Sequence, residues 1–185
     1  MKTPLPVLVT FLLTAAIAAA STPATAAAPA ASPASPATVT AAPKNLLKPT
    51  AKIGNWQFEQ LEEATGTIAT DGDALAITVT KVDGTEWHLQ VFQPGLDLKE
   101  GKTYVVTGKA RASVQRVGQI YAGVNEDDYH PIGLDEALDL TPTWRDFTFT
   151  FTADSVAAKN NRLGFSLGQE KGTIWLKDVT LAEKK

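Results

Sequence analysis

The amino-acid sequence predicts an all-β protein whose folded part, residues 44–185, is a two-sheet antiparallel β-sandwich. Short runs in which apolar and polar residues alternate recur along this part, and this is the period of a β-strand with one buried face. Turns rich in Gly, Asp and Pro separate the runs, as at Asp71-Gly72-Asp73 and Asp83-Gly84-Thr85. Only Ala153–Ala158 has a helix-like composition, and we expect a loop there.

The stretch from Glu86 to Ala112 shows this pattern most clearly. Alternation places Trp87 and Gln90 of its first run on opposite faces, and Pro94-Gly95 then signals a turn. The last run is rich in β-branched and aromatic residues, which favour strands. With so many short strands we expect a jelly-roll sandwich. The predicted strands are Trp56–Glu59, Gly66–Ala69, Ala74–Val79, Glu86–Gln93, Leu96–Leu98, Thr103–Ala112, Val117–Val124, Ala137–Leu140, Arg145–Thr152, Arg162–Leu167 and Thr173–Ala182.

The N-terminal 43 residues have a different composition. Lys2 precedes an apolar run and two A-x-A sites, so residues 1–20 indicate a secretory signal peptide, with cleavage as late as residue 26. Residues 21–43 contain only Ala, Pro, Ser, Thr and one Val, and this composition predicts a disordered linker. We therefore expect a secreted or periplasmic protein without a membrane attachment after cleavage.

The charge of the folded part excludes one class of partner. It holds 16 of the 17 basic residues and all 20 acidic residues, so its formal charge is −4. Nucleic-acid binding requires a basic surface, and we expect no nucleic-acid partner. The length fits one domain, and we expect a monomer.

No pattern in the chain is typical of a catalytic site. The chain has no Cys, and its two histidines, His88 and His130, lie on different predicted elements. Acidic pairs such as Glu62-Glu63 fall in predicted loops, where a solvated surface is expected. We therefore expect no catalysis.

Polar and aromatic residues on two predicted strands favour sugar binding. A sugar presents an apolar ring face and a rim of hydroxyls, which aromatic and polar side chains can contact. Arg162, Gly164 and Ser166 share the face that points away from the core, where Gly164 would leave space for a ligand. Gln119 and Tyr121 likewise share one face of their strand.

Four segments in order carry a family resemblance. The first contains Trp87-x-x-Gln90 followed by the pattern Gly-Leu-x-Leu-x-x-Gly-x-x-Tyr. The other three are Trp144–Thr152, Asn161–Gly168 and Ile174–Leu181. Together they resemble the carbohydrate-binding modules of families 4 and 9, the CenC type, over about residues 45–183. The resemblance implies a galactose-binding-domain-like jelly roll.

The resemblance also implies a set of ligand-binding residues. Trp87 and Tyr129 would stack on sugar rings, although a core position for Trp87 stays open. The hydrogen-bonding partners would be Gln90, Gln93, Gln119, Asn125, Arg162 and Ser166. Strict alternation cannot bring both Gln90 and Gln93 into one cleft unless the strand bulges. We expect Trp56, Trp144 and Trp175 in the core.

Family members commonly hold a structural calcium ion, and the resemblance implies Asp178 as one ligand. The acidic run of the family's N-terminal segment is replaced here by Lys48-Pro49-Thr50-Ala51. Calcium prefers several oxygen ligands with carboxylates among them. We therefore expect that no cofactor, calcium included, is required.

These observations lead to one function and two alternatives. We expect a secreted, non-catalytic module that binds a polysaccharide of β-glucan or xylan type, in association with glycoside hydrolases supplied in trans. One alternative is a small glycan-active hydrolase or lyase with a carboxylate near Tyr129. The other is a sandwich that binds no glycan and serves as a spacer or protein-adhesion module.

Overall fold

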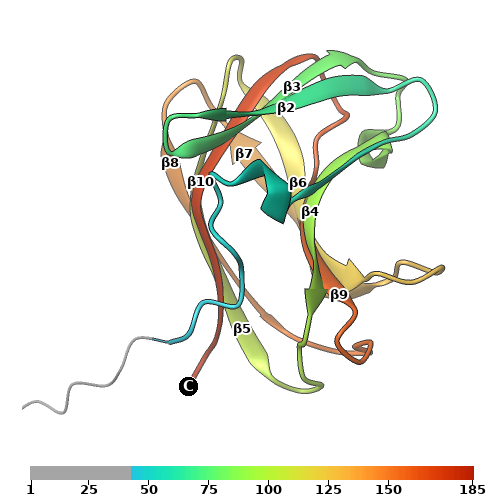
Figure 1. Cartoon of the computed structure of the whole chain (residues 1–185), viewed down its shortest axis with the longest axis vertical. Helices are drawn as coiled ribbons and strands as arrows, with labels where there is room; N and C mark the ends of the chain where they lie inside the picture. Colours follow the sequence, from blue (N-terminus) through green and yellow to red (C-terminus); the bar gives the residue numbers. More distant parts are fainter. Residues whose placement is uncertain (1–42) are drawn as a thin grey trace, which may run out of the picture. The chain divides into compact units, whose positions relative to one another are not determined.

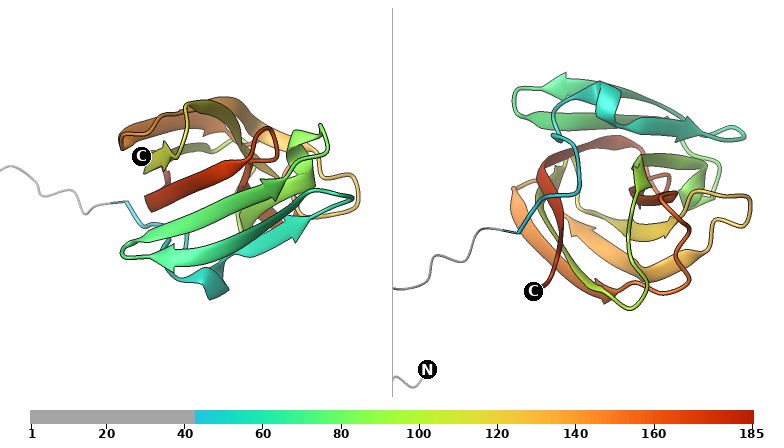
Figure 2. Two further views of the ribbon diagram at one scale, coloured as in Figure 1. Left: turned by 90° about the horizontal axis from the view of Figure 1, so that it is seen from above. Right: turned by 60° about the horizontal axis from the view of Figure 1, so that its bottom comes forward.

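The computed structural model describes residues 43–185, so the predicted signal peptide and almost all of the predicted linker lie outside it. The described residues form ten strands in two five-stranded antiparallel sheets (Figures 1 and 2). The first sheet has the order β1 (Gln57–Gln60), β4 (Leu89–Leu96), β9 (Asn161–Ser166), β6 (Arg116–Val124) and β7 (Pro131–Leu140). The second has the order β2 (Thr65–Asp71), β3 (Ala74–Lys81), β10 (Gly172–Glu183), β5 (Thr103–Ala112) and β8 (Arg145–Thr152). The predicted all-β sandwich is confirmed.

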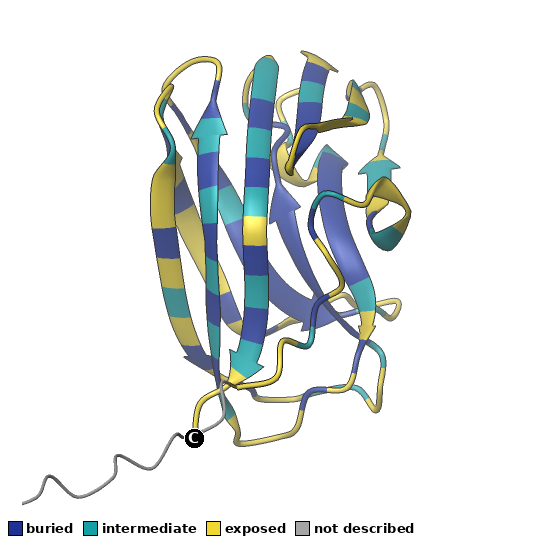
Figure 3. Ribbon diagram, turned by 60° about the vertical axis from the view of Figure 1, so that its left-hand side comes forward, coloured by how far each residue is buried: buried dark blue, intermediate teal, exposed yellow. Residues whose placement is uncertain are grey.

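The core lies between the two sheets and is built from the inward-facing half of each alternating strand. In β5, every second residue from Tyr104 to Ala112 is buried, and the residues between them are half-exposed. Figure 3 shows the same alternation along several strands. β9 is buried along its whole length, because it is the central strand of the first sheet and both of its faces are covered.

The strand predicted at Glu86–Gln93 begins later than expected. Residues 86–88 form a single 3₁₀ turn, η2 (Glu86–His88), and β4 starts only at Leu89. The turn interrupts the alternation that would have placed Trp87 beside Leu89 on the core face. Leu89 is fully buried, whereas Trp87 is 50% exposed. The turn thus frees Trp87 to reach the other face of the sheet.

The prediction of a separate strand at Leu96–Leu98 is wrong. β4 continues through Pro94 and Gly95 to Leu96, and its register with β9 shifts between Gln93 and Leu96. Gly95 has a φ of 76°, a conformation that glycine adopts without steric cost. The Pro-Gly pair therefore marks a β-bulge within one strand and not a turn between two. β7 is also longer than predicted, because it starts at Pro131 and not at Ala137.

Of the three tryptophans expected in the core, only Trp56 lies there. Its indole N–H donates a 2.9 Å hydrogen bond to the carbonyl of Thr50. Trp175 alternates with the buried Ile174 and points away from the core, and it lies half-buried on the outer face of the second sheet. Arg111 stacks there against Trp175 and Trp144, with its guanidinium carbon 4.1 Å and 5.2 Å from the two ring centroids.

Helical structure in residues 43–185 is limited to η2 and a second 3₁₀ turn, η1 (Ile53–Asn55). The loop expected at Ala153–Ala158 is confirmed. Within the described part of the chain, no helix has the length and apolar character needed to cross a membrane.

Candidate functional site

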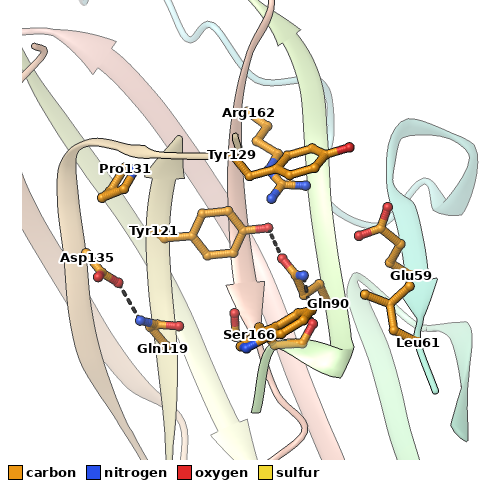
Figure 4. A pocket seen from close by; sticks show the side chains of 11 residues that line it. Glu59, Leu61, Gln90, Gln119, Tyr121, Tyr129, Pro131, Asp135, Arg162 and Ser166 are labelled. Carbon is orange, nitrogen blue, oxygen red and sulfur yellow. Dashed lines mark hydrogen bonds between the residues drawn. The ribbon is translucent and has the colours of Figure 1, made fainter. Parts of the chain in front are cut away.

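A cleft of about 510 Å³ lies on the face of the first sheet that points away from the core (Figure 4). All five strands of the sheet contribute to it, together with η2, the β6–β7 loop and the residue that follows β1. The lining residues are Glu59, Leu61, Trp87, Gln90, Gln119, Tyr121, Tyr129, Pro131, Asp135, Arg162 and Ser166. Aromatic, amide, hydroxyl and charged groups thus meet in one depression.

Four polar side chains form a row across the floor of the cleft. The strand register places Glu59 opposite Gln90, Gln90 opposite Ser166, and Ser166 opposite Gln119. Neighbouring strands lie about 4.8 Å apart, so this row crosses four strands over about 14 Å. The amide of Gln119 donates a hydrogen bond to the carboxylate of Asp135, which extends the row toward β7 (Figure 4).

Next to this row, Tyr121 lies across β9 above Gly164. A Cβ atom on Gly164 would be only 2.5 Å from the Tyr121 hydroxyl oxygen and 2.8 Å from Cβ of Phe92. The expectation that Gly164 leaves space for a ligand is wrong, because Tyr121 fills that space. Burial raises the pKa of Tyr121 far above its ordinary value. The hydroxyl therefore stays protonated and donates a 2.5 Å hydrogen bond to Oε1 of Gln90.

Arg162 is held among three aromatic rings. Its guanidinium carbon lies 4.6 Å from the ring centroid of Phe92, 5.2 Å from that of Tyr121 and 4.8 Å from that of Tyr129. The residue is only 5% exposed, and its Nε atom is buried without a hydrogen-bonding partner. Cation–π contacts of this kind contribute about 0.5–2 kcal/mol each. They hold the planar guanidinium in one orientation, with its edge available to the cleft.

Trp87 forms the wall of the cleft at the end where β4 begins. Its ring packs edge-on against His88, with the centroids 4.2 Å apart and the planes at 85°. His88 is held in turn by a 2.7 Å contact between Nδ1 and the carboxylate of Asp83. The carbonyl of Trp87 accepts a 2.7 Å hydrogen bond from the Gln90 amide. These contacts orient the Trp87 ring although half of its surface is exposed.

Tyr129 forms the opposite wall, in the loop between β6 and β7. Its backbone has a φ of 47°, and its N–H donates a 2.8 Å hydrogen bond to the carbonyl of Glu126. The neighbouring His130 braces the loop through both ring nitrogens. Nδ1 lies 2.8 Å from the carboxylate of Asp128, and Nε2 lies 2.8 Å from the carbonyl of Ser155. Tyr129 is 53% exposed, and one of its contacts is with the Arg162 guanidinium.

The structure brings together six of the eight predicted ligand-binding residues: Trp87, Gln90, Gln119, Tyr129, Arg162 and Ser166. Gln93 does not line the cleft. Its amide nitrogen and oxygen bond the backbone of Lys48 at 3.0 Å and 2.9 Å, so it fastens the N-terminal segment to β4. Asn125 does not line the cleft, and its backbone pairs with Asn160 across the neighbouring loops.

Sequence reasoning missed several residues of the cleft. Tyr121 is absent from the predicted ligand-binding residues, although the sequence already places it on the same strand face as Gln119. Asp135 was missed because β7 was predicted to begin only after it. Glu59 lies on a predicted strand but carries no local signal that would place it beside Gln90.

The residues around Asp178 do not fit a calcium site. Asp178 lies at a register shift in β10, where its φ is 53°. It lines a second depression together with Lys109, whose ammonium group lies 2.8 Å from the carboxylate of Asp146. Thr50, from the run that replaces the family's acidic segment, accepts a 2.9 Å hydrogen bond from the N–H of Val179. Among residues 43–185 no group of three His, Cys, Asp or Glu side chains is arranged to hold a metal ion.

A two-sheet sandwich with an aromatic-walled, amide-lined cleft on one outer face has the features of a carbohydrate-binding module. The family model of the carbohydrate binding domain of CBM families 4 and 9 matches residues 50–173, and the chain belongs to this family. It is a non-catalytic carbohydrate-binding module of the type that the sequence resemblance implies. A comparison with curated proteins gave no match.

Solved structures agree with this assignment. A CBM4 module is 27% identical with a TM-score of 0.65, over 70% of this chain and 86% of that one. The N-terminal cellulose-binding domain of β-1,4-glucanase C from Cellulomonas fimi is 24% identical with a TM-score of 0.60, over 78% of this chain and 99% of that one. The second N-terminal cellulose-binding domain of that glucanase is 18% identical with a TM-score of 0.60, over 77% and 96%. At these identities the two glucanase domains support the fold alone.

Proposed function

We propose that the cleft binds a polysaccharide chain of β-glucan or xylan type, lying across the strands between Trp87 and Tyr129. One observation carries this proposal: two aromatic rings, each about half exposed, flank a row of polar side chains. Large exposed aromatic residues beside a polar depression are typical of a binding surface. The rings suit the apolar faces of sugars, and Gln90, Gln119, Ser166 and the edge of Arg162 suit their hydroxyls.

The expected affinity is modest. A sugar ring that covers roughly 100 Å² of apolar surface gains about 2.5 kcal/mol at the usual transfer coefficient. Ordering the chain and removing water from its hydroxyls offset much of this gain. We therefore expect dissociation constants from about micromolar to about millimolar.

A glycan array followed by calorimetric titration tests the proposal. The purified protein should bind soluble β-glucan or xylan oligosaccharides, and a Trp87→Ala, Tyr129→Ala double variant should lose this binding with its melting temperature unchanged. Absence of binding to every glycan on the array would instead favour the spacer or protein-adhesion alternative.

The arrangement of the carboxylates supports binding without hydrolysis. The two carboxylates of the cleft, Glu59 and Asp135, come from β1 and β7, which are opposite edges of a five-stranded sheet. Four strand spacings separate these strands by about 19 Å. Glycoside hydrolases place their two carboxyl groups roughly 5–10 Å apart. Reducing-sugar release from the bound polysaccharide would contradict this conclusion.

We also propose that the protein is exported and acts as a monomer beside separate glycoside hydrolases. The signal-like N-terminal sequence and the family membership support this setting. Light scattering on the purified protein checks the monomer. Cell fractionation checks export, and co-precipitation with hydrolases on the bound polysaccharide checks the association.

A further inference from the structure

The two carboxylates of the cleft lie at its two ends. β1 and β7 are the edge strands of the first sheet, and the cleft crosses the strands between them. Glu59 on β1 starts the polar row of the floor, and Asp135 on β7 continues it beyond Gln119 (Figure 4). A glycan chain in this cleft would therefore pass a carboxylate where it enters and another where it leaves.

The negative charge of these two residues is not compensated by ion pairs. Neither carboxylate lies within ion-pair distance of a lysine, arginine or histidine of the described chain. Asp135 accepts its hydrogen bond from a neutral amide, that of Gln119. Both negative charges therefore act on any ligand in the cleft.

Arg162 is the only cation among the lining residues, so two carboxylates and one guanidinium leave the cleft with a formal charge of −1. Three aromatic rings contact the guanidinium of Arg162, and its single positive charge leaves the two carboxylates in excess. The charges of Arg162 and Glu59 both also act on the Tyr121 hydroxyl. Burial makes the largest contribution and raises the pKa of Tyr121. The charge of Arg162 lowers this pKa, and the charge of Glu59 raises it.

We propose that Glu59 and Asp135 make this cleft select uncharged glycan chains over chains that carry carboxylate groups. This inference rests on the proposed function and names the chemical class of its ligand. A uronic acid at either end of the cleft would bring a third carboxylate close to one already present, and like charges in such proximity repel each other. A neutral chain meets hydrogen-bond acceptors at the same two positions.

The experiment compares matched pairs of oligosaccharides. One pair is cellohexaose and its form oxidised at C6 to the uronic acid; the other is xylohexaose and the same backbone with glucuronic acid side groups. Titration calorimetry with the full protein at low salt should show about tenfold weaker binding of the acidic member. High salt should reduce this difference, because both carboxylates are near the surface and are screened.

Variants identify the residues responsible. In a Glu59→Gln, Asp135→Asn double variant, the ratio of the two affinities should approach one, because the acidic oligosaccharide no longer meets a like charge; the readout is this ratio and not the absolute affinity for the neutral member. A Glu62→Gln, Glu136→Gln variant removes two charges outside the cleft and should keep the parent's selectivity. Melting temperatures establish that both variants are folded.

The outcomes separate this inference from the proposed function. Equal or tighter binding of the acidic oligosaccharide by the parent would overturn charge selection and leave glycan binding in place. An unchanged preference in the Glu59, Asp135 double variant would also overturn it, because the discrimination would then come from elsewhere. Failure of all four oligosaccharides and of the wider array to bind would overturn the proposed function, and this inference with it.

Discussion

The Tyr121 hydroxyl donates a 2.5 Å hydrogen bond to the side-chain oxygen of Gln90, and this bond joins β6 to β4 over the top of β9. Both residues line the cleft, and the bond passes over Gly164 of the central strand, where an added side chain would collide with Tyr121. The floor of the cleft thus depends on a glycine that is not itself among the lining residues.

Gly164→Ala should disrupt this floor. The added methyl group would overlap the Tyr121 hydroxyl and Cβ of Phe92, and the ring would have to leave its place above β9. Overpacking of this kind costs about 1–3 kcal/mol of folding stability. Glycan affinity should fall as well, because Gln90 loses its partner. Chemical denaturation and calorimetric titration measure the two effects.

Gly118→Ala is the matched control for that variant. Gly118 lies on β6 of the same sheet, but its added Cβ would meet the ends of two flexible side chains, Leu167 and Leu140, at 3.2 Å and 3.3 Å. It should keep glycan affinity. If Gly164→Ala bound glycan as tightly as the parent, the proposed role of Tyr121 in the floor would be wrong.

Tyr129→Ala should weaken glycan binding about tenfold or more, since 1.4 kcal/mol of lost contact already gives tenfold. The residue is on a loop and half exposed, so the melting temperature should stay near that of the parent. Val114→Ala, an exposed apolar residue outside the cleft, is the control for surface truncation. Parent-like binding by Tyr129→Ala would show that the glycan lies elsewhere on the molecule.

Trp87→Ala distinguishes the two interpretations of this tryptophan. Removal of a core tryptophan would cost about 3–5 kcal/mol of stability. Trp87 is 50% exposed, so we expect a small change in stability and a large loss of glycan affinity. Thermal melts and titrations of the same preparation measure both, and a large drop in melting temperature with binding retained would contradict a stacking role.

Glycan affinity should fall as the pH rises above neutrality. The carbonyl of Ser155, and then the carboxylate of Asp128, raise the pKa of His130 above its ordinary value of about 6.5, with a further contribution from Glu126. Both acceptors need a ring N–H, so both contacts are complete only in the protonated form. The bracing of the Tyr129 loop is therefore fully present below about pH 6.5 and is lost as the pH passes through the raised pKa.

Titrations between pH 5.5 and 8.5 measure this effect. We expect affinity to fall about threefold toward alkaline pH, since the contacts of His130 are exposed and exposed ion pairs contribute little. His130→Gln should show a nearly constant affinity over the range. A pH dependence that survives in this variant would assign the effect to another group.

Chelation should barely change stability. Asp178 lines the same depression as Lys109. Thr50 accepts a hydrogen bond from the N–H of Val179, the residue after Asp178 on β10. The melting temperature in excess EDTA should therefore equal that in millimolar calcium. A drop of many degrees that calcium restores would contradict this and would demonstrate a calcium site of the kind that the family resemblance implies.

Export predicts a defined mature N-terminus. If the signal peptide is cleaved at either A-x-A site, N-terminal sequencing should find a start between Ser21 and Ala28. Retention of Met1 in a membrane fraction is the opposing result.

Local sequence patterns were sufficient to predict the fold class and most strand positions. Alternation in β5 and the polar faces of β6 and β9 are local patterns, because each side chain's face follows from its neighbours along the chain. By the same periodicity, Gln90 and Gln93 can face one cleft only if the strand bulges between them. The bulge in β4 comes after Gln93, so only Gln90 faces the cleft.

Pairing between distant strands brought some of these faces together into one site. Glu59, Gln90, Gln119 and Ser166 stand in one row only because four strands, distant in the sequence, pair in a particular register. A turn of three residues brought Trp87 to that row's side of the sheet, and Tyr121 occupied the space above Gly164. Hydrophobic patterning and turn geometry restrict the register of each strand, because a slip by one residue would turn its apolar side chains to the other face. Which strands become neighbours, when they are distant in the sequence, depends on the packing of the whole core.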